Sequence, residues 1–177
     1  LLRELVADGL LVNYNYEIAE SIESNIDALS LPVVWLNMRR DHDCVYPDDR
    51  RAGELATRRL LELGHRRIGY VVLSKSTHYS VSDREAGYCA ALRGAGLEPR
   101  ILRGGDRPAE WPGRICAFLE REMPSAVVCY APAFGAAVVH AARDMGLAVP
   151  SDLSVVVLGA DQACAYTVGI DLDAVDL

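Results

Sequence analysis

Short apolar runs rich in β-branched residues alternate along the chain with segments in which apolar residues recur every three or four positions. The short runs predict strands at residues 9–12, 32–36, 68–73, 100–102, 126–130 and 154–158. The periodic segments predict helices near residues 18–29, 52–63, 86–95, 115–119 and 134–145. Gly64, Gly96 and Gly146 follow three of these segments, as expected for a residue that lies just beyond a helix end.

The predicted strands are apolar almost throughout, and each one before the last is followed by a predicted helix. This order indicates a mostly parallel sheet with both faces covered, the doubly wound α/β class. A polar, irregular stretch at residues 74–82 interrupts the alternation, and we expect the chain to cross there between two lobes. The predicted lobes are residues 1–73 and 74–177, with crossovers near 74–77 and near the C-terminus.

Ligands of doubly wound sheets bind beyond the carboxyl ends of the strands. The residues that follow the predicted strands are polar or aromatic, and they include Tyr14, Tyr16, His78, Arg84, Trp111, Tyr130 and Asp161. Stacking rings, one guanidinium and one carboxylate suit a polyhydroxylated or anionic small molecule. A tyrosine at a strand end is also often a residue of the core edge, and that alternative stays open.

Composition and charge narrow the class of protein. The 177 residues are 51% hydrophobic and 24% charged, as in an ordinary globular protein, and no apolar run approaches the roughly 20 residues of a membrane-spanning helix. The net charge of −7 is shared by both halves, so neither half suits a polyanion. Four arginine pairs could form a phosphate-binding stripe, but acids lie between them and favour a solvated surface.

Motifs of catalysis and cofactor binding are missing from the sequence. No glycine-rich phosphate loop and no HExxH pair occurs, so we expect no cofactor and no metal. The five cysteines are odd in number and widely spaced, which favours reduced thiols in a cytoplasmic protein. The one candidate catalytic pair, Ser80 with His78, lacks a third member. The adjacent carboxylates of Asp48 and Asp49 suit helix capping at least as well as acid–base chemistry.

Seven short motifs together resemble one family. They are Asp8-Gly9-Leu10-Leu11, Leu31-Pro32-Val33-Val34, Asp48-Asp49-Arg50-Arg51-Ala52-Gly53, the block from Leu61 to Tyr70 that contains Gly64-His65-Arg66-Arg67-Ile68, Arg84-Glu85-Ala86-Gly87-Tyr88, Ala95-Gly96-Leu97, and the block from Met145 to Val156. Their order and spacing are similar to those of LacI/GalR-type bacterial transcription regulators over nearly the whole chain. The resembling part of those regulators is their effector-binding core.

The resemblance implies a periplasmic-binding-protein-like type I fold, with two doubly wound parallel-sheet lobes, here truncated at both ends. It further implies a cytoplasmic homodimer that binds a small effector in a cleft and binds DNA through an N-terminal helix-turn-helix domain missing from these residues. No cofactor, membrane contact or enzymatic activity is implied. The alternative with the same fold is a secreted solute-binding protein of a sugar transporter.

The resemblance also assigns ligand-binding residues. It implies that Arg84 grips effector hydroxyls or a carboxylate and that Asp161 belongs to the same site, although Arg84 could instead cap a helix or pair with Asp83. It places Asp48 near the cleft, His78 and Ser80 in a crossover loop that lines it, and Trp111 beneath a sugar ring. Because we expect Arg84 in a loop at a strand end, Arg84→Ala should abolish the effector response and leave the fold intact.

One departure from the family pattern bears on the effector. Ala131 and Pro132 stand where the family has an Asn-Asp pair, so hydrogen bonds to effector hydroxyls would be lost, at about 1–3 kcal/mol for each partner left unpaired. We therefore expect ordinary sugars to bind poorly. The effector is then less hydroxylated and stacks on Tyr130 and Phe134, or the regulator responds weakly to sugars.

Overall fold

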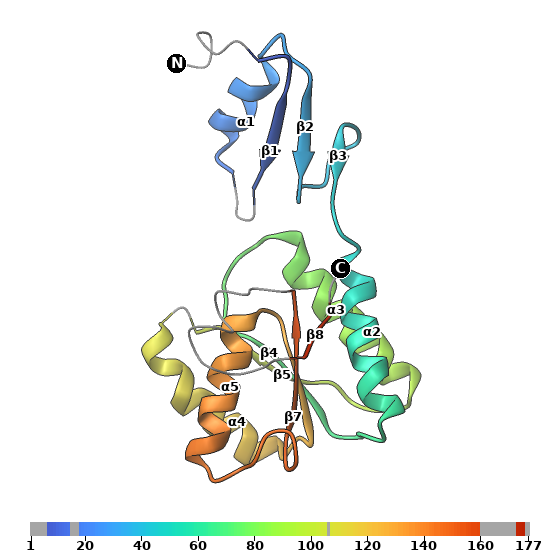
Figure 1. Cartoon of the computed structure of the whole chain (residues 1–177), viewed down its shortest axis with the longest axis vertical. Coiled ribbons are helices and arrows are strands. Elements are labelled where there is room, and N and C mark those ends of the chain that lie inside the picture. Colours follow the sequence, from blue (N-terminus) through green and yellow to red (C-terminus); the bar gives the residue numbers. More distant parts are fainter. Residues whose placement is uncertain (1–6, 15–17, 106, 160–172, 176–177) are drawn as a thin grey trace. The chain divides into compact units, whose positions relative to one another are not determined.

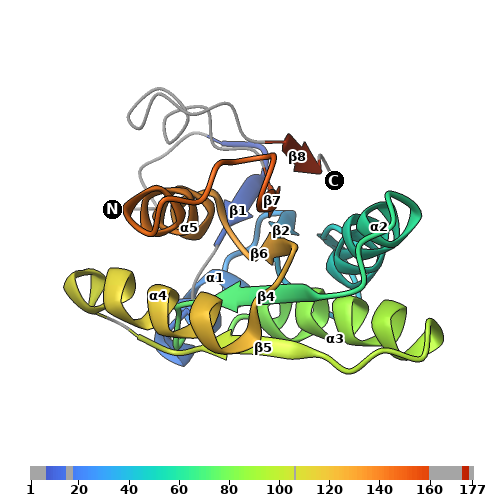
Figure 2. The same cartoon turned by 90° about the horizontal axis from the view of Figure 1, so that it is seen from below.

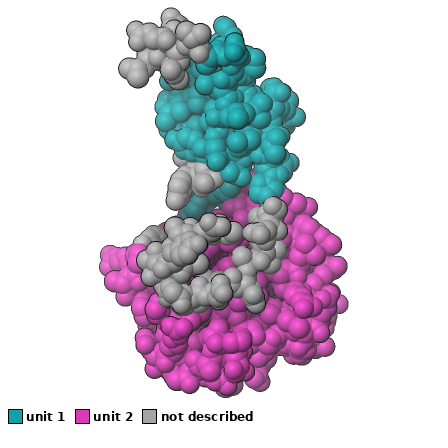
Figure 3. Space-filling view, viewed as in Figure 1, with its two compact units in different colours: residues 1–47, 76–78 teal, residues 48–75, 79–177 magenta. Residues whose placement is uncertain are grey.

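The computed structural model describes residues 7–14, 18–105, 107–159 and 173–175 (Figure 1). The chain forms two compact units, a smaller one of residues 1–47 with 76–78 and a larger one of residues 48–75 with 79–177 (Figure 3). This division differs from the boundary predicted near Ser74. Residues 48–73 belong to the larger unit because their helix packs against the helix that follows residue 78 and their strand lies inside the larger sheet.

The smaller unit has a three-stranded parallel sheet in the order β1 (Leu10–Asn13), β2 (Val33–Leu36) and β3 (Cys44–Val45), with one helix, α1 (Glu20–Asp27). Among its described residues, Trp35 is the one buried hydrophobic side chain. The Arg40 guanidinium lies 4.6 Å from the centre of the Trp35 ring and forms 2.7 Å ion pairs with Glu23 and Asp27 of α1. A cation therefore covers the core residue and ties the helix to the sheet.

The larger unit has a five-stranded parallel sheet in the order β5-β4-β6-β7-β8. The strands are β4 (Ile68–Val72), β5 (Arg100–Arg103), β6 (Ala126–Cys129), β7 (Ser154–Leu158) and β8 (Asp173–Val175). The helices are α2 (Asp49–Glu62), α3 (Tyr79–Gly94), α4 (Trp111–Glu122), preceded by a 3₁₀ turn at Pro108–Glu110, and α5 (Pro132–Asp144). Figure 2 shows α2 and α3 on one face of this sheet and α4 and α5 on the other. The predicted doubly wound α/β architecture is confirmed.

The centre of the larger sheet is completely buried. Every residue of β4 and β6 is buried, as the unbroken apolar runs predicted. The Phe118 ring of α4 packs on Gly69, where an added Cβ would lie 2.9 Å from the ring. The Tyr88 hydroxyl of α3 donates to the Ile68 carbonyl at 2.8 Å and accepts the Arg100 N–H at 2.9 Å, so it ties α3 to two strands.

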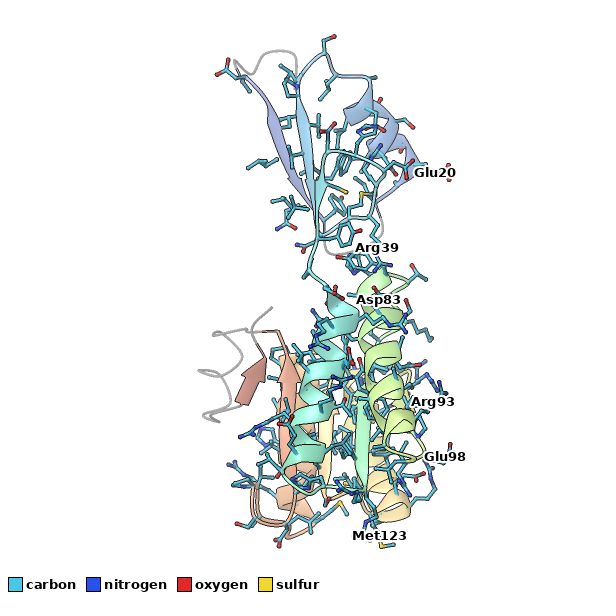
Figure 4. The ribbon with its side chains drawn as sticks, turned by 90° about the vertical axis from the view of Figure 1, so that its right-hand side faces the viewer. Glu20, Arg39, Asp83, Arg93, Glu98 and Met123 are labelled. Carbon is cyan, nitrogen blue, oxygen red and sulfur yellow. The ribbon has the colours of Figure 1, made fainter. Side chains whose placement is uncertain are left out.

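Helices α2 and α3 lie side by side at close range (Figure 4). A Cβ added at Gly53 would lie 2.0 Å from the Arg84 carbonyl oxygen, and one added at Gly87 would lie 2.0 Å from the Arg50 carbonyl oxygen. These glycines belong to the two motifs Ala52-Gly53 and Gly87-Tyr88, so the structure gives both motifs a packing role. No other residue type fits there without moving a backbone.

The buried face of α2 differs from the predicted one. Ala52, Ala56 and Leu60 are buried as expected, but Leu55 and Leu63 are 43% and 58% exposed. The remaining buried positions of α2 hold Asp49, Gly53 and Thr57. Small residues occupy most of this face because α3 approaches closely at Gly53, where a Cβ atom would clash with the Arg84 carbonyl.

The Gly64-His65-Arg66-Arg67 block forms the turn from α2 to β4. Gly64 has a φ of 93°, as predicted for a residue beyond a helix end. The His65 Nδ1 atom lies 2.9 Å from the Ser125 hydroxyl, and Arg66 donates to the Leu61 and His65 carbonyls. The block therefore ends α2 and connects this end to the loop before β6. The Arg66 guanidinium is a hydrogen-bond donor to backbone carbonyls.

The sequence predicted reduced cysteines and no membrane-spanning helix. Cys44, Cys89, Cys116 and Cys129 are free thiols, as expected, while Cys164 lies outside the described residues. No helix within the described ranges combines the length and the hydropathy that crossing a membrane requires.

Candidate functional site

The carboxyl edge of the larger sheet contains a change in strand order. The chain runs from β4 outward to β5 and then returns past β4 to β6, so β4 and β6 are neighbours whose following segments diverge. Such a switch point is where doubly wound sheets bind ligands. The segments that leave it lead to α3 and α5, and Figure 4 shows Asp83 near this end of α3 and Arg93 near the other end.

Arg84, in the second turn of α3, is bonded to three other elements at this edge. Its Nε atom donates to the Asp49 Oδ1 atom of α2 at 2.6 Å. Its Nη1 atom donates to the Tyr130 carbonyl after β6 at 2.8 Å and to the Leu158 carbonyl of β7 at 3.2 Å. The guanidinium also lies 5.0 Å from the centre of the Tyr130 ring, within range of a cation–π interaction.

Asp49 is the partner that the sequence analysis did not select. It is 1% exposed, in the first turn of α2, and its Oδ2 atom has no hydrogen-bond partner among the described residues. The signal was present in the sequence, because Asp49 lies three residues before Ala52 and seven before Ala56 on the buried face of α2. A carboxylate on that face needs a cationic partner, which α3 supplies.

Aromatic side chains continue the site from Tyr130. The Tyr130 hydroxyl lies 2.8 Å from the Ser80 hydroxyl, and its ring lies 6.2 Å from the Phe134 ring. Trp111 meets Phe134 edge to face at 5.1 Å, and its Nε1 atom donates to the Gly105 carbonyl. Phe134 itself is 7% exposed, so it supports the other two rings more than it presents a surface of its own.

Tyr70, in β4, adds a buried hydroxyl near this network. Its Oη atom has no hydrogen-bond partner among the described residues. Burial raises the pKa of Tyr70 strongly, and Arg84 partly opposes that rise. The hydroxyl therefore stays protonated at neutral pH.

The structure brings Arg84, Ser80 and Tyr130 together directly, and Trp111 joins them through Phe134. The other predicted site residues are engaged elsewhere. Asp48 caps α2 by accepting the Arg51 N–H at 2.9 Å, the structural role that the sequence offered for it.

Two predicted residues belong to the smaller unit. The His78 Nε2–H donates to the Asn37 carbonyl at 2.9 Å. Tyr14 follows β1, is half-buried, and donates its backbone N–H to the Leu36 carbonyl at 3.4 Å. Asp161 lies outside the described residues.

Two expectations about the crossover loop are wrong. Helix α3 begins at Tyr79, so Ser80 and Arg84 lie on a helix instead of a loop. Arg84 pairs with Asp49, and its side chain is only 13% exposed. Arg84→Ala would leave a buried carboxylate without its cation, a loss of about 3–5 kcal/mol, so the fold does not tolerate it freely.

In the described parts of the chain, no three His, Cys, Asp or Glu side chains form a cluster that could bind a metal ion. Ser80, the candidate nucleophile, has the Tyr130 hydroxyl as a partner, and His78 has a backbone carbonyl. The arrangement as a whole offers hydrogen-bond donors, aromatic rings and one ion pair, which suits binding of a small molecule.

Comparison with known proteins agrees with this chemistry. Residues 57–174 match the model of the periplasmic binding protein-like domain. Over 156 residues the chain is 29% identical to the HTH-type transcriptional repressor PurR of Actinobacillus pleuropneumoniae. This alignment covers 84% of this chain and 46% of that protein. The chain is 33% identical over 126 residues to the HTH-type transcriptional regulator GalR of Salmonella typhimurium, covering 66% and 35% of the two.

A solved structure shares the fold. The sugar-binding transcriptional regulator of the LacI family from Escherichia coli, complexed with phosphate, superposes with a TM-score of 0.75 at 28% identity and covers 94% of this chain and 62% of that chain. The present chain spans less than half the length of the two curated relatives.

Proposed function

We propose, from the premise that this chain belongs to the LacI/GalR family of transcriptional regulators with a periplasmic binding protein-like domain, that it forms the effector-binding core of such a regulator. The effector binds at the carboxyl edge of the larger sheet. The observation that carries this proposal is the convergence of Arg84, Tyr130 and Ser80 at the switch point between β4 and β6.

The site can act as a sensor because its residues come from separate elements. Arg84 of α3 bonds to α2, to the end of β6 and to the end of β7. An effector that contacts this network changes the relative free energy of two forms of the protein by its difference in affinity for them. A coupling of about 1–3 kcal/mol changes DNA affinity about 5- to 150-fold.

The partners follow from the same premise. The whole regulator binds DNA through a helix-turn-helix domain outside these residues, forms a homodimer and works in the cytoplasm. It catalyses no reaction. The relatives named above are transcriptional regulators, so the comparisons do not favour a secreted solute-binding protein.

Calorimetric titration of the 177-residue chain with a panel of monosaccharides, disaccharides and nucleobases tests the proposal. Ser80→Ala and Ser125→Ala form a matched pair, because each removes one serine hydroxyl group and the two hydroxyl groups lie at opposite edges of the same sheet. We expect one ligand class to bind, and we expect Ser80→Ala to weaken it about tenfold by releasing Tyr130. Ser125→Ala should change the dissociation constant less than twofold.

Two results contradict the proposal. Absence of saturable binding across the panel means that the chain is no sensor of these molecules. Binding that responds to Ser125→Ala and ignores Ser80→Ala places the ligand at the other edge of the sheet.

A further inference from the structure

We propose that Asp49 sets the charge of the effector site by neutralising Arg84, so that the site selects an uncharged effector. This inference rests on the proposed function, since it concerns the ligand of the same site. Its basis is a buried ion pair between α2 and α3 that the sequence motifs did not predict.

The pair is largely buried. The side chains of Arg84 and Asp49 are 13% and 1% exposed, and their charged atoms lie 2.6 Å apart. Because two opposite charges lie so close together, their fields largely cancel at a third group placed farther away. An anion placed near Arg84 therefore meets the carboxylate of Asp49 together with the guanidinium.

The Arg84 guanidinium can still donate hydrogen bonds although Asp49 compensates its charge. A guanidinium has five N–H donors, and Nε and Nη1 use three of them on Asp49, Tyr130 and Leu158. The two N–H groups of Nη2 donate to no acceptor within the described residues. Arg84 thus offers two donors without a net charge, which suits a hydroxyl, carbonyl or ring nitrogen.

Two described neighbours of the pair, Glu85 and the start of α5, add no uncompensated charge to it. Glu85, the next residue of α3, forms a two-point ion pair with Arg103 at 2.6 and 2.8 Å. Helix α5, whose start faces the switch point, begins with Pro132, which has no N–H to give to an anion.

The carboxylate of Asp49 depends on Arg84 alone among the described residues. Its Oδ1 atom bonds to the Arg84 Nε atom, and its Oδ2 atom has no hydrogen-bond partner there. Removal of the Asp49 charge therefore leaves the guanidinium uncompensated, and the site becomes a cationic one. That change is a gain of anion binding, which a loss of structure cannot imitate.

Asp49→Asn tests the inference with inorganic phosphate as the probe, at constant ionic strength. Asp48→Asn is the matched control, because it removes the same charge from the neighbouring residue, keeps a good capping side chain and has its hydrogen bond to Arg51 instead of Arg84. We expect Asp49→Asn to bind phosphate at least tenfold more tightly than the unaltered chain. Asp48→Asn should match the unaltered chain within twofold.

A folded Asp49→Asn chain without this gain overturns the inference, and so does phosphate binding by the unaltered chain that is as tight as binding by Asp49→Asn. Circular dichroism and a cooperative unfolding transition establish that the variant is folded. The phosphate measurement needs no knowledge of the effector, so it can succeed even where the Ser80→Ala experiment fails.

A second measurement uses the unaltered chain and covers the case in which Asp49→Asn does not fold. Each neutral sugar of the panel is titrated beside its uronic acid, which has the same ring and one added carboxylate. We expect the neutral member of any binding pair to bind at least tenfold more tightly. Equal or tighter binding of the uronic acid overturns the inference.

Discussion

The two units are built from the same kind of element and differ in how much they bury. In the larger unit, every residue of β4 and β6 is buried and helices cover both faces of the sheet. In the described part of the smaller unit, Trp35 alone is a buried hydrophobic side chain, and α1 has no buried residue. The larger unit is held together by apolar packing, and the smaller one depends on Arg40 and its acidic partners.

Two units with the same alternation of strands and helices can therefore differ in stability. Burial of a large apolar side chain contributes about 1.5–3 kcal/mol, whereas an exposed ion pair contributes about 0–1 kcal/mol. The smaller unit therefore opens at a lower free energy than the larger unit. Leu11 and Val45 of its sheet remain 74% and 62% exposed, in keeping with an incomplete core.

The largest expected effect comes from the contact between α2 and α3. Gly87→Ala places a methyl group 2.0 Å from the Arg50 carbonyl oxygen, so the helices must separate and the bond between Arg84 and Asp49 must lengthen. We expect the free energy of unfolding of the larger unit to fall by about 3 kcal/mol or more. Urea denaturation followed by circular dichroism measures it.

Gly94→Ala is the matched control for this prediction. Gly94 lies at the end of the same helix with nothing within 4 Å of an added Cβ. Alanine is the better helix former, so we expect a gain of about 0.5–1 kcal/mol. Equal effects of the two substitutions would show that helix propensity, and not the close approach of α2, decides the result.

An intermediate effect is expected in the smaller unit. Arg40→Ala removes the cation over Trp35 and both ion pairs to α1, which together contribute about 1–2 kcal/mol. In a Trp111→Phe background, Trp35 is the one remaining tryptophan, and its fluorescence reports the smaller unit. We expect the denaturation midpoint of the smaller unit to fall in Arg40→Ala, while the midpoint of the larger unit stays constant.

Arg40→Met separates packing from charge, since its side chain still covers the Trp35 ring. It should lose less stability than Arg40→Ala. A parallel fall of both units' midpoints in either variant would mean that they unfold as one cooperative body.

The last prediction compares the reactivity of two thiols in the unaltered chain. Burial raises the pKa of the Cys129 thiol, so its thiolate fraction at pH 8 is low, while Cys44 of the smaller unit is only half-buried. Brief alkylation followed by peptide mass spectrometry should label Cys44 at least ten times faster than Cys129. Comparable alkylation rates of Cys44 and Cys129 would contradict the conclusion that the larger unit buries its residues more completely than the smaller unit.

Local features of the fold could be predicted from the sequence. Continuous apolar runs identified six of the strands, and three- and four-residue spacing identified the five α-helices, since both patterns follow from the geometry of each element. The two-residue strand β3 carries too few residues for a pattern. The helix starts at Tyr79 and Asp49 were missed because polar residues occupy their first turns.

The alternation of elements, the helix-ending glycines and the motifs shared with the family can be read from the amino-acid sequence, because these depend on residues close together in the chain. The folded structure was needed to show that residues 48–73 join the larger unit, that Leu55 and Leu63 face outward, and that Arg84 meets Asp49. Those outcomes depend on the approach of α2 to α3, between residues 35 positions apart. Spacing along one helix shows which residues share a face, and the partner helix decides which face is buried.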